Sequence, residues 1–218
     1  GTYCQAPGIE PPTLRRILTA GAPINPVMLE RFDSVLRPEA YLHTPYGATE
    51  CLPVATASSH ELLSETIHQT RQGRGLCVGH PVDRMQVRIL AIEDEPIEHI
   101  DRAKELGPGE VGEICVSGPV ATRCYDKMPG HTGRAKIMDP SLGEDGFWHR
   151  MGDVGYLDEQ GRLWYCGRKA HRVEAAHGTR FTSACEASFN THEDGFRSAL
   201  GGVGPRGAQR PVILIEAV

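Results

Sequence analysis

One short stretch decides the fold of this chain, Thr44-Pro45-Tyr46-Gly47-Ala48-Thr49-Glu50. Pro45 has no backbone N–H and Gly47 can adopt backbone angles closed to other residues, so we expect a constrained loop at the end of a strand. Its side chains suit a nucleotide, since Tyr46 offers a flat face to a base, Thr49 a hydroxyl to an oxyanion and Glu50 an oxygen ligand to Mg²⁺. A tight turn followed by the capped start of a helix is the other interpretation of the same residues.

Two later motifs follow along the chain, Gly152-Asp153-Val154-Gly155 and Gly167-Arg168. Together with the first stretch, they resemble the adenylate-forming superfamily of acyl- and aryl-CoA synthetases, peptide-synthetase adenylation domains and luciferases. Those enzymes carry an aromatic-Gly-x-Thr-Glu motif, then a Gly-Asp-x-Gly turn, then a Gly-Arg pair at the hinge of a small mobile domain. Gly21-Ala22-Pro23 is similar to the family's adenine-side ribbon, and Gly112-Glu113-Ile114 to its Gly-Glu-[Ile/Leu] strand. Several matches in the family's order are far more specific than any one of them.

The resemblance implies that ATP activates a carboxylate, whose oxygen attacks the α-phosphate to give an acyl-adenylate. Glu50 would hold Mg²⁺ and Thr49 would contact phosphate and acyl carboxylate oxygens, and these two are the implied catalytic residues. Asp153 would accept hydrogen bonds from both ribose hydroxyls, and Arg168 would reach the ribose or a phosphate. The implied adenine slot consists of Gly21, Ala22, Pro23, Tyr46 and Gly47. Without the resemblance, Asp153 also fits a simple turn, Arg168 a surface charge and Tyr46 core packing.

Within the superfamily, the chain most resembles the β-lactone-forming synthetases of bacterial olefin biosynthesis, through residues 43–50, 165–169, 185–192 and 204–211. This implies that the adenylate of a long-chain 2-alkyl-3-hydroxy acid closes to a β-lactone, with other olefin-pathway enzymes as partners. The hinge position holds Ala170 where the family usually has Asp or Lys, and 171–178 lacks a Lys-x-x-Gly pattern, which argues against a CoA step. The alternatives are a fatty-acyl-CoA or acyl-AMP ligase, and an inactive segment that only binds nucleotide or substrate.

The chain divides into three blocks. We expect a partial α/β subdomain over 1–75 with a helix beginning at Pro26, a small β-rich, barrel-like subdomain over 76–166, and the start of a mobile α+β lid domain over 167–218. The acidic run at 93–95 is interpreted as a solvated loop. Residues 202–207 match the G-x-G-x-x-G pattern, but Pro205 interrupts it and a strand-like run follows, so we predict a loop between two strands.

Length and composition narrow the interpretation further. The chain has 218 residues, whereas the enzymes it resembles are more than twice as long. No phosphate loop precedes Gly21 and no lysine follows Lys169, so we expect an internal fragment without adenylating activity of its own. A net charge of −5 gives no case for nucleic acid as a partner, and no apolar run is long enough to span a membrane. Seven cysteines without Cys-x-x-Cys indicate reduced thiols in the cytoplasm, and the scattered histidines do not suggest a structural zinc site.

Overall fold

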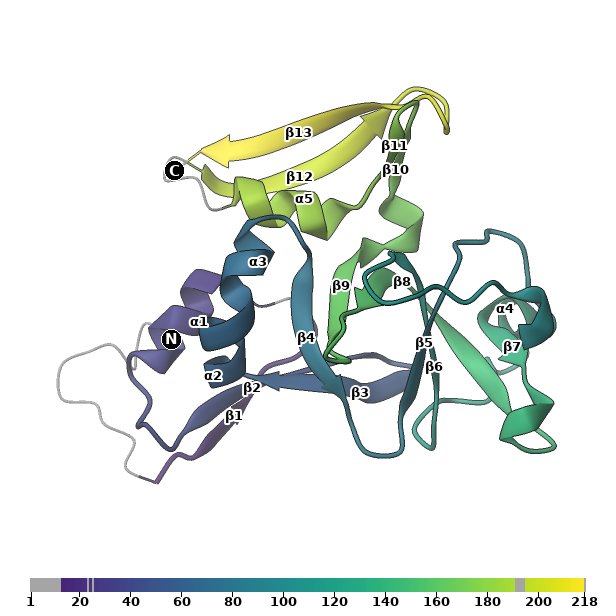
Figure 1. The fold of residues 1–218 in the computed structure, drawn as a ribbon, viewed down its shortest axis with the longest axis horizontal. Helices are drawn as coiled ribbons and strands as arrows, with labels where there is room; N and C mark the ends of the chain where they lie inside the picture. Colours follow the sequence, from purple (N-terminus) through teal and green to yellow (C-terminus); the bar gives the residue numbers. More distant parts are fainter. Residues whose placement is uncertain (1–12, 23, 25, 191–194, 218) are drawn as a thin grey trace.

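The computed structural model describes residues 13–22, 24, 26–190 and 195–217 (Figure 1). Its largest unit is a nine-stranded sheet with the order β1-β2-β3-β4-β9-β8-β6-β5, in which β7 also pairs with β8. The strands of this sheet are β1 (Arg16–Leu18), β2 (Tyr41–Ala48), β3 (Cys51–Ser58), β4 (Leu76–Pro81), β5 (Gln86–Leu90), β6 (Gly112–Ser117), β7 (Lys136–Met138), β8 (Phe147–Leu157) and β9 (Leu163–Arg168).

The first end of the sheet is an α/β layer. Strands β1 and β2 are parallel, and helix α1 (Pro26–Asp33) connects them, as the sequence predicts. A second helical segment follows β3 and lies beside α1 in Figure 1; its side-chain cap is Ser58, whose hydroxyl accepts from the backbone N–H of Glu61. This segment comprises α2 (Ser59–Glu61), the π-helical turn η2 (Leu62–Thr66) and α3 (Ile67–Arg71). Helices therefore cover the parallel end of the sheet.

The stretch at 44–50 is not the loop that the sequence predicts, because β2 continues through it to Ala48. Pro45 lies opposite Thr56 of β3, and a register shift between Tyr46 and Ala48 accommodates the irregular ladder. Gly47 is required for space rather than for its backbone angle, since an added Cβ would lie 2.4 Å from the carbonyl oxygen of Cys51. The alternative interpretation was also wrong, because a strand and not a helix follows the turn.

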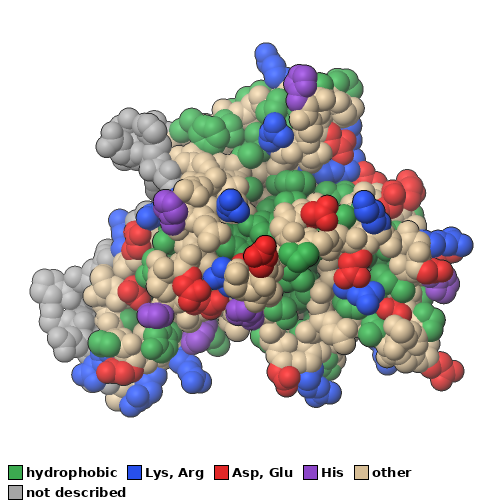
Figure 2. Space-filling model, in the orientation of Figure 1, with side chains coloured by type: hydrophobic (Ala, Val, Ile, Leu, Met, Phe, Trp, Pro, Cys, Tyr) green, Lys and Arg blue, Asp and Glu red, His purple; other side chains and the backbone are tan. Residues whose placement is uncertain are grey.

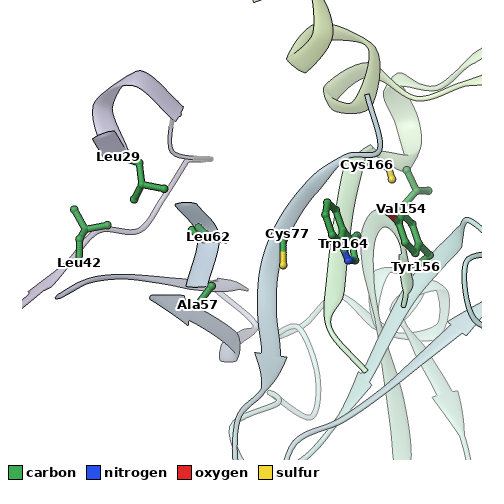
Figure 3. Packing of buried hydrophobic residues seen from close by; sticks show 9 residues of the cluster. All are labelled: Leu29, Leu42, Ala57, Leu62, Cys77, Val154, Tyr156, Trp164 and Cys166. Carbon is green, nitrogen blue, oxygen red and sulfur yellow. The ribbon is translucent and has the colours of Figure 1, made fainter. Parts of the chain in front are cut away.

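The antiparallel remainder of the sheet is rich in strands. Short helical turns punctuate it, namely η3 (Ile100–Arg102), α4 (Pro129–Ala135) and η4 (Pro140–Leu142). The ladder is continuous from β3 into β4, so the predicted boundary at residue 75 falls between hydrogen-bonded strands. One apolar cluster also crosses that boundary, from Leu29 of α1 to Trp164 of β9, whose indole stacks on Tyr156 at 5.8 Å (Figure 3). The division into 1–75, 76–166 and 167–218 stays a prediction.

The last part of the chain packs on the sheet as a separate layer, seen at the top of Figure 1. It contains η5 (Lys169–His171), β10 (Val173–Ala175), β11 (Gly178–Arg180), α5 (Thr182–Phe189), β12 (Gly195–Val203) and β13 (Arg210–Ala217). Strands β12 and β13 pair antiparallel, so residues 202–207 span the end of a hairpin and its loop, as predicted. Helix α5 contacts both β12 and β9, which joins this layer to the sheet.

The acidic run at 93–95 is exposed, but it is more than a solvated loop. The Asp94 carboxylate accepts from Arg172 at 2.5 Å and from Arg206 at 3.3 Å. Above all, the Arg172 hydrogen bond holds the pKa of Asp94 below its ordinary value. The backbone carbonyls of Glu93 and Glu95 accept from the buried Arg150. The run therefore ties the last layer to the sheet.

Charges of both signs are interspersed over the face drawn in Figure 2. Among the described residues, no helix combines the length and apolar character that crossing a bilayer requires. All six cysteines in the described part of the chain are free thiols.

Candidate active site

A cavity of about 280 Å³ lies between the α/β layer and the ends of β8 and β9. It brings together six of the seven residues predicted to bind the nucleotide, which come from segments more than a hundred positions apart in the sequence. These are Gly21, Ala22, Tyr46, Gly47, Asp153 and Arg168. The seventh, Pro23, lies outside the described residues. Apolar side chains such as Leu29 and Leu62 and hydroxyl side chains such as Thr44 complete the lining, so the cavity offers both apolar and polar surface.

Tyr46 is fixed in the cavity by its hydroxyl, which donates to Oδ2 of Asp153 at 2.7 Å. Burial, together with the neighbouring Asp153, raises the pKa of Tyr46 well above its ordinary value, so this phenol stays neutral and keeps donating. Its ring centroid lies 6.1 Å from that of Tyr165, with the planes tilted by 47°. Tyr46 and Tyr165 thus form an aromatic pair at one wall of the cavity.

Asp153 is 4% exposed and forms an ion pair with Arg168 in the first cavity. Its Oδ1 lies 3.0 Å from Nη1 of Arg168 but accepts no hydrogen bond from any described residue. Burial raises the pKa of Asp153, although the Tyr46 hydroxyl and the Arg168 charge oppose this. A buried polar atom that has an ion-pair neighbour but no hydrogen-bond donor is uncommon in native proteins and calls for an explanation. A ligand hydroxyl would supply the missing donor.

The hairpin of β8 and β9 explains why Asp153 and Arg168 face each other. The turn after Asp158 pairs Leu157 with Leu163, and a register shift between Val154 and Gly155 brings Asp153 opposite Arg168. Sequence reasoning missed Tyr165, which lies opposite Gly155 in the same hairpin. The Asp158–Gly161 turn was the signal that could have found it, because a turn fixes the register of both strands.

A second cavity, of about 530 Å³, adjoins the first and shares four lining residues with it: Gly21, Pro45, Gly47 and Arg168. It contains both predicted catalytic residues, Thr49 and Glu50, at the turn between β2 and β3. It also contains Tyr125 and His149, which the sequence did not single out as ligands. The predicted nucleotide and catalytic residues therefore line two contiguous cavities.

Glu50 is held as a carboxylate. The Tyr125 hydroxyl donates to its Oε1 at 2.9 Å. Burial opposes ionisation, but a backbone N–H, the Tyr125 hydroxyl and nearby positive charge together hold the pKa of Glu50 below its ordinary value. Magnesium is commonly held by one or two carboxylates plus waters and substrate phosphates, so a single ionised Glu50 fits this metal. The described residues contain no cluster of three or more His, Cys, Asp or Glu side chains that would form a complete metal cage.

A buried cation lies behind the second cavity. Lys136, which is 6% exposed, donates to the carbonyl oxygen of Thr122. Its Nζ is also 3.1 Å from Nδ1 of His149. Nδ1 of His149 in turn lies 3.2 Å from the carbonyl oxygen of Ala135. Burial and the Lys136 charge lower the pKa of His149 to about 4, so the imidazole is neutral near pH 7.

Arg150 also lines the second cavity, but its guanidinium is occupied elsewhere. It donates to Oε2 of Glu113 from both Nε and Nη2, at 3.0 and 2.7 Å, in an ion pair with almost no solvent exposure. Lys169 lies 3.0 Å from the other oxygen of Glu113. Arg150 is thus a structural residue.

Ala170, the predicted hinge residue, is exposed within η5 and lines neither cavity. It follows directly after Arg168 and Lys169, at the point where the chain leaves the sheet for its last layer. Its role as a hinge stays a prediction.

Comparisons with a family model and with curated proteins find related enzymes. A family model described as "AMP-binding enzyme" matches residues 5–126. An olefin beta-lactone synthetase of Stenotrophomonas maltophilia is 48% identical over 206 residues, covering 94% of this chain and 37% of that protein. A protein of the same name from Xanthomonas campestris is 46% identical over the same shares. The chain thus spans little more than a third of the length of these curated relatives.

The fold has a solved counterpart in O-succinylbenzoate coenzyme A synthetase of Bacillus subtilis. In its unliganded form that structure superposes with a TM-score of 0.73 at 20% identity, covering 98% of this chain and 40% of that one. The same enzyme in complex with ATP and magnesium ion gives a TM-score of 0.71. At this identity the likeness concerns the fold alone.

Proposed function

Because this chain belongs to the AMP-binding enzyme family, we propose that the full-length protein activates a carboxylic acid with ATP, forming an acyl-adenylate and pyrophosphate. The observation that carries the proposal is the buried Asp153 carboxylate that lines the first cavity, bonded to Tyr46 and ion-paired with Arg168, whose Oδ1 has no hydrogen-bond donor among the described residues. An ionised carboxylate only accepts hydrogen bonds, and ribose hydroxyls are donors that it can pair with. In this assignment Tyr46 and the Gly21-Ala22 ribbon flank the adenine.

The reacting groups meet in the second cavity. Thr49 contacts the acyl carboxylate and α-phosphate oxygens through its hydroxyl, which donates to one of them at a time. Arg168, which lines both cavities, neutralises phosphate charge. Glu50 is the protein's ligand for Mg²⁺, which when bound neutralises charge on the phosphates. Such a displacement depends on positioning and on charge stabilisation more than on covalent chemistry by the protein.

For the substrate, we propose a long-chain 2-alkyl-3-hydroxy acid whose adenylate closes to a β-lactone. The support is the 48% and 46% identity with two olefin beta-lactone synthetases across 94% of the chain. The hinge segment supports the same substrate. Ala170 stands where the superfamily usually has Asp or Lys, and residues 171–178 lack the Lys-x-x-Gly pattern of CoA ligases. The same proposal places the protein in the cytoplasm beside other enzymes of olefin synthesis, and the free thiols are compatible with that compartment.

The test is a product analysis with the full-length protein, ATP and Mg²⁺. A 3-hydroxy acid should give AMP, pyrophosphate and a β-lactone at a rate that added CoA does not change. A thioester that forms only with CoA would identify a CoA ligase instead. Acid-dependent ATP–pyrophosphate exchange that is absent with every acid would refute the adenylation itself.

A further inference from the structure

The polar side chains of the second cavity are nearly all committed to one another. The Tyr125 hydroxyl donates to Glu50, and the Arg150 guanidinium is saturated by Glu113 and backbone carbonyls. Arg168 pairs with Asp153. The Tyr125 hydroxyl and the Arg150 guanidinium therefore hold the cavity in shape and are not available to a small polar group on a substrate.

Thr49 and Glu50 are assigned above to the acyl carboxylate, the α-phosphate and Mg²⁺, and His149 is a further residue of this cavity with a polar atom left over. Its Nδ1 faces Lys136 and Ala135, at 3.1 and 3.2 Å. Its Nε2 has no hydrogen-bond partner among the described residues, yet it is not one of their sealed, unpartnered polar atoms. Since the residue lines the second cavity together with Thr49 and Glu50, Nε2 is reachable from that cavity.

The two contacts of Nδ1 determine what Nε2 can bind. If Lys136 donates to Nδ1, Nε2 carries the proton and is a donor; if Nδ1 donates to Ala135, Nε2 is an acceptor. A hydroxyl group can both accept and donate, so it pairs with either tautomer. Because burial keeps the pKa of His149 near 4, the ring is neutral and suits an uncharged partner.

We propose that Nε2 of His149 binds the 3-hydroxyl of the acyl substrate and thereby selects 3-hydroxy acids over plain fatty acids. The inference rests on the proposed function, in which the acyl carboxylate lies at Thr49 in the same cavity. A 3-hydroxyl that is to close a four-membered ring must lie beside that carboxylate. His149 is thus a specificity-determining residue that also orients the hydroxyl.

Two variants separate this role from a structural one. In His149→Asn the amide reaches the position of Nδ1, so it can still pair with Lys136, but nothing replaces Nε2. In His149→Gln the longer side chain carries its amide to the position of Nε2. A purely structural role predicts that Asn is the better substitute, whereas substrate recognition predicts Gln.

The measurement is kcat/KM for ATP–pyrophosphate exchange in the full-length protein, with a 3-hydroxy acid and with the matched acid lacking that hydroxyl. The wild-type protein should prefer the 3-hydroxy acid. His149→Asn should reduce this preference by about 10-fold, the effect of one hydrogen bond, while His149→Gln retains most of it. Thermal unfolding of both variants reports on the fold.

Three results would overturn the inference: no preference in the wild-type protein, an unchanged preference in His149→Asn, or an equal loss with both acids. If the wild-type protein gives no exchange with any acid, the proposed function fails and the inference falls with it. Exchange without altered selectivity refutes the inference alone.

Discussion

Replacing Asp153 by Asn should weaken nucleotide binding without weakening the fold. The Asn side chain keeps the shape and can still accept from Tyr46, but it removes the negative charge of a residue that lines the cavity. A hydrogen bond to a charged group contributes about 1.5–3 kcal/mol, so the dissociation constant for AMP should rise by roughly 10- to 150-fold.

The stability of the fold should stay the same or increase. Burial raises the pKa of Asp153 above its unfolded value, so the folded state binds a proton more readily than the unfolded one, and ionisation near pH 7 destabilises the protein. Asn removes that cost. The ion pair that is lost involves Arg168, whose side chain is 53% exposed and contributes little.

Asp158 supplies a matched control on the same hairpin. Its carboxylate accepts from Nε1 of Trp164 at 2.9 Å and from Nε of Arg162 at 2.8 Å, and these bonds, against the opposing effect of burial, lower its pKa. Asp158→Asn should therefore cost about 1.5–3 kcal/mol of unfolding free energy. Because Asp158 lines neither cavity, AMP affinity should not change.

The assay pairs isothermal titration of the full-length protein with AMP and 2′-deoxy-AMP against urea unfolding of each variant. The ratio of AMP affinity to 2′-deoxy-AMP affinity should be smaller in Asp153→Asn than in the wild-type protein. The substitution removes the carboxylate and the deoxy sugar removes the hydroxyl of the same contact, so the two effects do not add. Equal losses of AMP affinity in the two variants, or a stability loss in Asp153→Asn as large as in Asp158→Asn, would refute the reasoning.

Three further predictions concern the second cavity and its surroundings. Glu50→Gln should lower acid-dependent ATP–pyrophosphate exchange by about 10²–10³-fold, or roughly 2–4 kcal/mol of barrier, with an unchanged Tm; near-normal exchange would remove Glu50 from the metal site. Glu113→Ala should cost about 3–5 kcal/mol of unfolding free energy because it leaves the buried Arg150 unpaired, and a urea-measured loss below about 1 kcal/mol would contradict that. The pKa of His149 is about 4 in the folded state and near 6.5 in the unfolded state. Neutral His149 should therefore contribute about 3 kcal/mol of unfolding free energy above pH ~6.5, and this contribution should be lost as the pH falls toward 4. An equal pH slope of stability in His149→Gln would disprove this.

Much of the fold was predictable because local patterns determine it. Pro26 begins a helix between two parallel strands, and the interrupted glycine pattern at 202–207 lies at the end of a hairpin, both as predicted. The path of the chain through Pro45 was not predictable, because proline and glycine usually break strands. Here the pairing with β3 and a register shift outweigh that local preference.

The sequence identified residues of the site but not the contacts between them. The motifs identified Tyr46 and Asp153, yet the bond between them joins positions 107 residues apart, and no local pattern reports such a contact. Lys136 was missed and His149 was given no binding role for the same reason, since only the pairing of β7 with β8 brings them together. Oδ1 of Asp153 lacks a hydrogen-bond donor among the described residues because of the directions in which its neighbours point. Those directions cannot be inferred from the sequence.

A crystal structure of the full-length protein with AMP tests the central claim most directly. The account predicts that a ribose hydroxyl donates to Oδ1 of Asp153 and that the adenine lies against Tyr46, within the cavity that Gly21 and Arg168 also line. AMP bound outside this cavity, or a ribose with no contact to Asp153, would contradict the account.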